Sequence, residues 1–395
     1  MTPASGDAAL RYIAEDAPTG YGDAADRLVG AVRTAGTRVE YRGWSATAFG
    51  APPALLPFSR DEQPDELAVP GAPTVAHLVP EYYPLVKATA PAGPFVGHTV
   101  WESDRLPHHW PDLLNATDAV IVPTEWNREV FVAGGVQVPV AVVPHVATEP
   151  EPGDRGSALG LPVDDVVFYT IGRWDERKAV FRTVRAFLDA FTASDPVTLV
   201  VKTGMTIEMP PSEWGAQSRL AYTTAWQLAS IVREYRNPAR VQLEVENWSP
   251  ERIAGLHHRG DCYLTLARGE GWGIGAFDAT AYGNPVIATG WGGFLEYLTA
   301  DDAYLVDHVI VPVHHHAFAS YSPDQHWAEA DTEHAVELLR AVAADPDAAR
   351  ERARSAQARV VCNYSGPVVA AQFADVLAQL TRDPPGGSGA RHSAS

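Results

Sequence analysis

Short hydrophobic runs alternate with amphipathic segments along most of the chain. In the first part, apolar runs occupy residues 10–14, 38–41, 74–79, 95–100, 119–122 and 140–143. A second series begins at 166–171 and continues at 197–201, 241–245, 262–266 and 286–288. Strands alternating with helical patterns are typical of parallel α/β sheets. The pattern therefore predicts two such sheets in succession.

The helical patterns between these strands support the same fold class. One helix is expected from about Asp23 to Thr34. Another follows the first strand of the second series, where the apolar residues fall on one face of a helix at Val180, Phe181, Val184, Phe187, Leu188 and Phe191. A face of this width is expected to pack against a sheet.

Proline, glycine and charge divide the chain into domains. The segment 148–156 combines all three and predicts a linker, which gives an N-terminal Rossmann-like domain at 1–150 and a second one at 151–365. Gly366 and Pro367 precede a last apolar-periodic helix at 366–381, and the polar tail 382–395 is expected to be disordered. Substrates are expected in a cleft between the two domains.

Composition narrows the possible partners. The chain has 395 residues, 46% of them hydrophobic, and a net charge of −19, which argues against binding to nucleic acid or anionic membranes. No apolar run reaches the roughly eighteen residues of a membrane span, and the N-terminus lacks a signal-peptide pattern, so we expect a soluble, cytoplasmic protein. The two cysteines, Cys262 and Cys362, have neither metal-ligand spacing nor a disulfide framework.

The most informative segment is 268–289. Two carboxylates, Glu270 and Asp278, are separated by seven residues that include Gly271, Gly273 and Gly275, and an apolar strand leads into them. This order predicts a strand, a glycine turn and the start of a helix, where free backbone N–H groups form an anion site. At 3.6 residues per turn, Asp278 lies about two turns further on, so both acids can face one cleft.

These motifs resemble those of the retaining family 4 glycosyltransferases, which have the GT-B fold. The carboxylate pair matches the family's E-x7-E signature, except that Asp278 is one methylene shorter than the usual glutamate. Downstream, 283–287 and 292–296 match the family's later glycine, proline and acid positions, and upstream 172–178 matches its G-R-x4-K segment. The resemblance implies two facing Rossmann-like domains and a helix at 366–381 that crosses back onto the N-terminal domain.

The resemblance also implies roles for individual residues. Arg173 and Lys178 would hold the donor diphosphate, Glu270 would contact the transferred sugar, and Asp278 would bind the nucleotide ribose. The remaining donor contacts are expected from the turn and helix start, at Gly271, Trp272, Gly273 and Ile274. A guanidinium and an ammonium can stabilise a leaving diphosphate, so no metal or other cofactor is expected beside the nucleotide sugar. The absence of Asp-x-Asp between the strands of either series favours the same view.

The N-terminal domain leaves two interpretations open at Gly20 and Gly22. The segment 20–25 approximates the G-x-G-x-x-A fingerprint of NAD-dependent oxidoreductases, with Glu40 about twenty residues on. However, residues 15–19 separate the strand from the first glycine. In GT-B enzymes a glycine loop at this place faces the donor phosphates, and a plain glycine turn is the third alternative.

A second N-terminal segment, 97–107, follows the fourth strand and resembles the family's G-[YH]-x-x-W-E pattern. His98 is a candidate for positioning the sugar or the acceptor, Glu102 for binding acceptor hydroxyls or a cation, and Trp101 for stacking. A satisfied core histidine and a structural tryptophan are the alternatives. The neighbouring histidines at 257–258 and 314–316 lack the spacing of zinc ligands, so no metal site is expected.

Together these observations predict a retaining, metal-independent glycosyltransferase. It would move a sugar from a UDP- or GDP-sugar to a small soluble acceptor, for example in antibiotic biosynthesis. The sequence is also compatible with a homodimer. The alternatives are a GT-B epimerase or phosphorylase, the NAD-dependent oxidoreductase, and a non-catalytic relative that binds sugar nucleotides.

Overall fold

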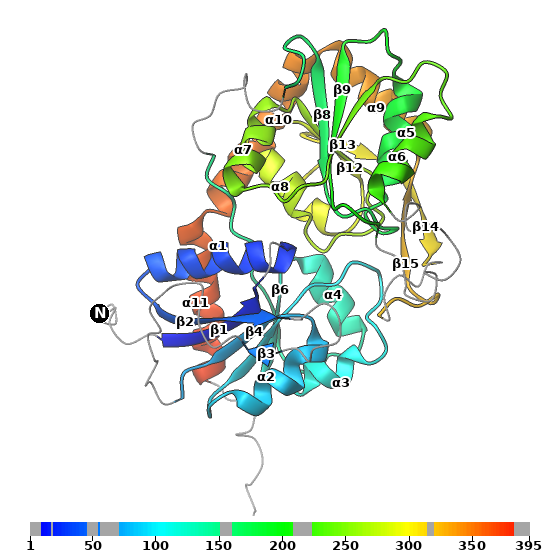
Figure 1. The fold of residues 1–395 in the computed structure, drawn as a ribbon. Coiled ribbons are helices and arrows are strands. Elements are labelled where there is room, and N and C mark those ends of the chain that lie inside the picture. Colours follow the sequence, from blue (N-terminus) through cyan, green and yellow to red (C-terminus); the bar gives the residue numbers. More distant parts are fainter. Residues whose placement is uncertain are drawn as a thin grey trace, which may run out of the picture. The chain divides into compact units, whose positions relative to one another are not determined.

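The computed structural model describes residues 9–16, 19–45, 54–55, 71–150, 160–207, 223–313 and 320–382. The chain forms two compact units (Figure 1). Unit 1 takes its described residues from Met1–Trp101, Leu106–Ala147 and Asn363–Ser395, and unit 2 from Glu102–Arg105 and Thr148–Cys362. The short segment Glu102–Arg105 therefore belongs to the second unit although its neighbours belong to the first.

Unit 1 is built on a twisted sheet whose described strands run in the order β3-β2-β1-β4-β5-β6-β7. Their bounds are Ala9–Glu15 for β1, Arg38–Ser45 for β2, Ala54–Leu55 for β3, Thr74–His77 for β4, Phe95–His98 for β5, Ala119–Val122 for β6 and Val140–Val142 for β7. All pairs are parallel except β2 with the short edge strand β3. After β1 the chain adds β2 and β3 on one side of it, and then returns to add β4 and the later strands on the other side. The strand order therefore reverses between β1 and β4.

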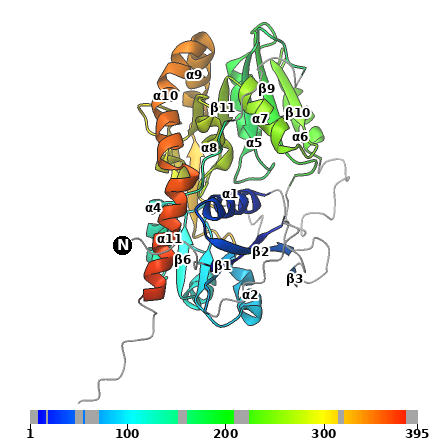
Figure 2. The ribbon, with the colours of Figure 1, turned by 90° about the vertical axis from the view of Figure 1, so that its left-hand side faces the viewer.

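Helices cover the sheet of unit 1. They are α1 at Gly20–Thr34, α2 at Tyr83–Thr89, α3 at Trp110–Asn115, α4 at Glu125–Ala133 and α11 at Gly366–Arg382, with a 3₁₀ turn η1 at Pro80–Tyr82. The C-terminal helix α11 lies beside α1 (Figure 2). Gly366 allows this approach, because a methyl group there would lie 3.3 Å from Cβ of Ala31. Further along, Phe373 is buried and its ring packs on that of Tyr12.

Unit 2 contains a fully parallel sheet whose described strands have the order β10-β9-β8-β11-β12-β13. Their bounds are Val166–Ile171 for β8, Val197–Lys202 for β9, Arg240–Glu244 for β10, Cys262–Thr265 for β11, Val286–Thr289 for β12 and Tyr304–Val306 for β13. This is the Rossmann order, and it reverses between β8 and β11. A separate antiparallel pair, β14 at His308–Pro312 and β15 at His326–Ala330, packs beside it.

The helices of unit 2 bury the apolar faces expected from the sequence. They are α5 at Val180–Ala190, α6 at Thr224–Val232, α7 at Pro250–Arg259, α8 at Ile274–Ala281, α9 at Thr332–Ala344 and α10 at Pro346–Asn363, with a 3₁₀ turn η4 at Gly292–Glu296. Val184, Phe187 and Leu188 of α5 are buried in one core with Leu199 and Leu264 of the sheet.

The predicted α/β class with parallel sheets is confirmed, and the differences are local. Gly20 and Gly22 do not form a loop. They lie in the first turn of α1, where the Thr19 hydroxyl accepts a hydrogen bond from the Gly22 amide over 3.2 Å. This N-cap starts the helix three residues earlier than predicted, and it leaves no dinucleotide-binding glycine turn. The antiparallel β14 and β15 and the strand β13 were not predicted, and the predicted tail lies outside the described residues from 383 on.

Candidate active site

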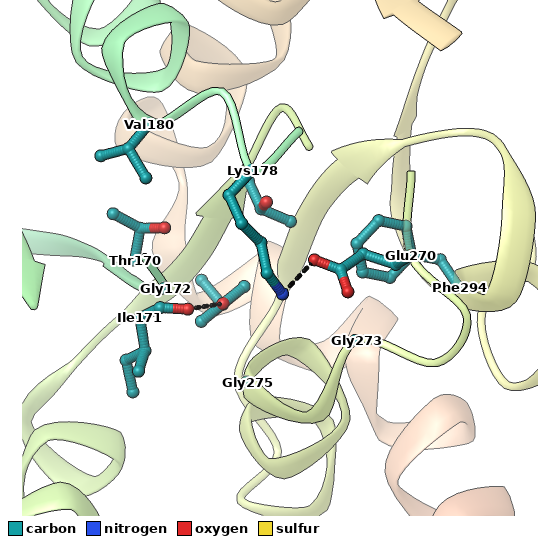
Figure 3. A pocket seen from close by; sticks show the side chains of 11 residues that line it. Thr170, Ile171, Gly172, Lys178, Val180, Glu270, Gly273, Gly275 and Phe294 are labelled. Atoms are coloured by element: carbon teal, nitrogen blue, oxygen red, sulfur yellow. Dashed lines mark hydrogen bonds and ion pairs between the residues drawn. The ribbon is translucent and has the colours of Figure 1, made fainter. Parts of the chain in front are cut away.

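A polar cavity lies where the strand order of unit 2 reverses. Its floor comes from the carboxyl ends of β8 and β11, which are the usual place for a ligand in an open α/β sheet. The cavity is small, with a volume of about 20 Å³. Its walls are lined by Thr170, Ile171, Gly172, Lys178, Val180, Tyr263, Thr265, Glu270, Gly273, Gly275 and Phe294 (Figure 3).

Two helices begin at this cavity. Helix α5 starts at Val180, two residues after Lys178, and α8 starts at Ile274, directly after Gly273. Neither N-cap makes a side-chain hydrogen bond, and both N-caps are left-handed, Ala179 with φ 46° and Gly273 with φ 87°. Because helix N-termini carry partial positive charge, the two together favour an anion in the cavity.

Ala179 is the one non-glycine residue with positive φ among the described residues. An L-residue pays about 1–2 kcal/mol for this conformation, which a structure retains only where its surroundings enforce it. Ala179 is fully buried, and its strained turn aims Lys178 and the first turn of α5 at the cavity.

The glycines on the opposite wall are required by close packing. A methyl group on Gly273 would lie 2.3 Å from the ring of Phe294. One on Gly293 would lie 2.2 Å from the carbonyl oxygen of Gly271, because the Gly293 amide donates to the Glu270 carbonyl over 2.7 Å. This backbone contact fixes the turn that carries Glu270.

Glu270 is the centre of charge in the cavity. Its carboxylate accepts a hydrogen bond from the Lys178 ammonium (Figure 3), and Nη1 of Arg177 lies 3.3 Å from its second oxygen. Burial raises the pKa of Glu270, but Lys178 and Arg177 outweigh it and hold the pKa below its usual value. Glu270 is therefore ionised at neutral pH.

Arg177 is a buried arginine in the same cluster, and the motifs did not predict it. Besides Glu270, it donates to the Gly269 carbonyl over 2.7 Å and lies 3.6 Å from the Glu102 carboxylate, which also accepts from the Tyr321 hydroxyl over 3.2 Å. Burial lowers the pKa of Arg177, but the carboxylates of Glu102 and Glu270 raise it well above its usual value. In the sequence, the signal that could have predicted Arg177 as a site residue is its place directly before Lys178.

The other predicted donor residues lie in different surroundings. Arg173 has half of its side chain exposed and pairs with Asp175 at 3.6 Å, and Asp278 is buried on α8. Neither is among the described residues that line the cavity. Of the four roles taken from the resemblance, the structure brings Lys178 and Glu270 together there.

The aromatic candidates belong to the cores. Trp272 is buried and packs on Phe277 and Tyr297, while Trp101 is buried against Trp110 in unit 1. Gly271 lies in the turn before Gly273, and Ile274 begins α8.

The remaining polar candidates are placed as follows. Glu102 pairs with Arg177 in unit 2, and His98 is buried at the end of β5 in unit 1. Of the histidine pair at 257–258, His257 is buried, and its Nδ1 atom lies 2.8 Å from the Tyr169 hydroxyl. The described residues contain no metal-binding group of three histidines, cysteines or acids, and His314–His316 lie outside them.

Two Rossmann-like units with this cavity at the switch point of the second define the GT-B class of glycosyltransferases. Residues 128–373 match the model of the family described as family 4 glycosyltransferases in conflict systems. The match covers more than half of the chain, so the chain belongs to this family. A relative, the D-inositol 3-phosphate glycosyltransferase of Rhodococcus erythropolis (strain PR4 / NBRC 100887), is 30% identical over 199 residues, which are 49% of this chain and 40% of the relative.

Solved structures share the fold over nearly the whole chain. Sucrose-phosphate synthase (tll1590) from Thermosynechococcus elongatus superposes with a TM-score of 0.66 at 16% identity, covering 95% of this chain and 99% of that one. Anabaena Alr3699/HepE in complex with UDP-glucose superposes with a TM-score of 0.64 at 14% identity, covering 94% and 100%. At these identities the likeness shows the fold alone. Separately, no helix in the described part of the chain is long and apolar enough to cross a bilayer.

Replacement of Arg177 tests whether its charge stabilises the fold through Glu270 and Glu102. Arg177→Leu leaves Glu270 and Glu102 without their shared buried partner, so we expect the free energy of unfolding to fall by about 3 kcal/mol. Arg173→Leu removes a half-exposed arginine from the same loop and should change it by no more than about 0.5 kcal/mol. Denaturant unfolding of both variants measures the difference, and equal losses would contradict the role of Arg177.

A second prediction concerns pH. Because the folded pKa of Glu270 is lowered, its ion pairs stabilise the fold above the usual glutamate pKa of about 4.3, and this contribution is lost as pH falls through the folded pKa. The melting-temperature difference between wild type and Glu270→Gln should therefore stay constant from about pH 8 to pH 5 and shrink below about pH 4. A difference that shrinks near pH 6 would mean that burial, not Lys178 and Arg177, controls Glu270.

Proposed function

We propose that this chain is a retaining glycosyltransferase that moves a sugar from a nucleoside diphosphate sugar to a small soluble acceptor in the cytoplasm. The observation that carries the proposal is the convergence of the Lys178 ammonium and two helix N-termini on one cavity, with Glu270 as its counter-charge. This arrangement of positive charge suits a diphosphate, whose negative charge grows as the glycosidic bond breaks.

In the proposed reaction the bond between the sugar and the diphosphate of the donor would break. The diphosphate would take over part of the ion pair that Lys178 makes with the Glu270 carboxylate, while Arg177 keeps Glu270 in place through its own ion pair. The acceptor hydroxyl would attack on the face from which the diphosphate leaves, so that a leaving-group oxygen takes the acceptor proton and the anomeric configuration is retained. In this scheme the chain supplies charge and position rather than a nucleophile.

UDP is the first nucleotide to test, because the Anabaena HepE structure of the same fold contains UDP-glucose, and GDP is the second. The acceptor is proposed to be small and neutral or cationic, since a chain of net charge −19 repels polyanions. Antibiotic or other small-molecule assembly fits such an acceptor. Incubation with UDP- and GDP-sugars, with detection of released nucleotide, tests the activity, and tight binding without turnover would favour a non-catalytic relative.

The reaction is also proposed to need no metal. Among the strands of the two sheets there is no Asp-x-Asp, and Asp345 and Asp347 lie at the start of α10, where Asp345 accepts from the Ala348 amide and Asp347 pairs with Arg350. Activity should therefore survive excess EDTA, and NMR should show the donor's anomeric configuration in the product. Loss of activity that Mg²⁺ or Mn²⁺ restores, or an inverted anomer, would contradict the mechanism.

Lysine replacement tests the diphosphate contact. Lys178→Ala should lower kcat by about a hundredfold or more, because the ammonium is worth most when charge develops on the leaving diphosphate. Lys87→Ala is the matched control, since Lys87 donates to the Ala116 carbonyl in unit 1. Steady-state kinetics with a saturating donor measures both, and an unchanged kcat in a folded Lys178→Ala protein would remove Lys178 from the site.

A further inference from the structure

Unit 1 has a polar cluster at its own switch point, between β1 and β4. Tyr12 lies on β1, His77 ends β4 and His98 ends β5. His77 and His98 are register partners on adjacent parallel strands, so their side chains leave the sheet on the same side. Ala14 of β1 pairs with His77, and Tyr12, two residues earlier, therefore shares that face.

One tyrosine hydroxyl connects the two histidines. The Tyr12 Oη atom is 2.9 Å from His77 Nδ1 and 3.0 Å from His98 Nδ1. The imidazole rings stack with their centroids 3.8 Å apart and an angle of 5° between their planes. All three side chains are buried, with exposures of 1% for Tyr12, 2% for His77 and 1% for His98.

The hydroxyl contact restricts the protonation of both rings. Two imidazolium ions stacked at this distance would repel strongly, and burial lowers the pKa of each histidine well below its usual value, so both are neutral. A neutral imidazole carries one N–H, and a hydroxyl carries one hydrogen. Tyr12 therefore donates to one Nδ1 and accepts from the other, which requires opposite tautomers. Opposite tautomers also oppose the dipoles of the stacked rings, which favours the stack.

The other ring nitrogen of His98 is left unpaired by this cluster. Its Nε2 atom is buried and has no hydrogen-bond partner among the described residues. Buried polar atoms in proteins are nearly always paired, so an orphaned nitrogen at a switch point calls for an explanation. A bound substrate hydroxyl, which can both donate and accept, would satisfy it.

We propose that Tyr12 is a positioning residue that holds His77 and His98 in opposite tautomers and so couples the hydrogen-bonding role of His98 Nε2 toward a substrate hydroxyl to the tautomer of His77. The role toward a substrate rests on the proposed function, whereas the opposite tautomers follow from the geometry and burial of the three side chains. Tyr12 acts through the histidines and does not itself touch the reacting atoms.

Nitrogen-15 NMR of histidine-labelled protein tests the tautomers without any turnover. The resonances are assigned with His77→Gln and His98→Gln. We expect one of the two rings to be protonated on Nδ1 and the other on Nε2. Two rings with the same tautomer, or a positively charged ring near neutral pH, would overturn the proposal.

Tyr12→Phe then tests the role of the hydroxyl. Without it, neither Nδ1 has its partner, so we expect each histidine to populate both tautomers and kcat/KM to fall about tenfold, the cost of one misdirected hydrogen bond. Tyr41→Phe is the matched control, because Tyr41 stacks on Tyr12 but its hydroxyl donates to Asp26 over 3.1 Å. It should keep both tautomers and the wild-type rate.

The outcomes separate this inference from the proposed function. Tyr12→Phe protein with unchanged tautomers and an unchanged rate would overturn the positioning role. Opposite tautomers in a wild-type protein that releases no nucleotide from UDP- or GDP-sugars would support the role of Tyr12 in fixing the tautomers and overturn the proposed activity.

Discussion

The buried charge cluster around Glu270 is the constraint on which the rest of unit 2 depends. One carboxylate compensates Lys178 and Arg177, and Arg177 is shared with Glu102. Ion pairs at this depth cost desolvation, so a fold keeps them only where geometry is tight. The strained Ala179 turn and the Gly293 contact behind Glu270 supply that geometry.

This constraint is met at a topological reversal, where the cavity lies. The strand order reverses between the paired strands β8 and β11, and helices α5 and α8 both begin there, each without a side-chain N-cap. The backbone dipoles and the Lys178 ammonium therefore add up at one point, and the Glu270 carboxylate balances them. In the proposed reaction a diphosphate would replace one anionic partner of Lys178 with another, and the positive charges that receive it are already oriented, which is what electrostatic catalysis requires.

Hydrophobic periodicity predicted the strands of both sheets well, because nine of the eleven predicted runs form largely buried strands, and the other two, at 140–143 and 241–245, form partly buried edge strands. Strand β13 is only three residues long, and β14 and β15 form an antiparallel pair outside both parallel sheets, so neither follows the alternation of strand and helix on which the prediction rested. The prediction of a glycine loop at Gly20 and Gly22 was wrong because Thr19 caps the helix just before them, which places both glycines in its first turn. At the site, motif spacing identified Lys178 and Glu270, but whether a neighbouring arginine turns inward, as Arg177 does, depends on tertiary packing.

Both units use their switch point in the same way, but with different chemistry. In unit 2 the reversal gathers charge, whereas in unit 1 it gathers neutral groups: two histidines and one tyrosine hydroxyl. Charged groups suit a diphosphate, since an ion pair is strong and depends little on the angle at which the two groups meet. Neutral imidazoles suit hydroxyls, since each nitrogen must either donate or accept. The proposed transfer joins a charged leaving group to an uncharged nucleophile, so it would call on both kinds of chemistry, the charges of unit 2 for the diphosphate and the neutral groups of unit 1 for hydroxyls.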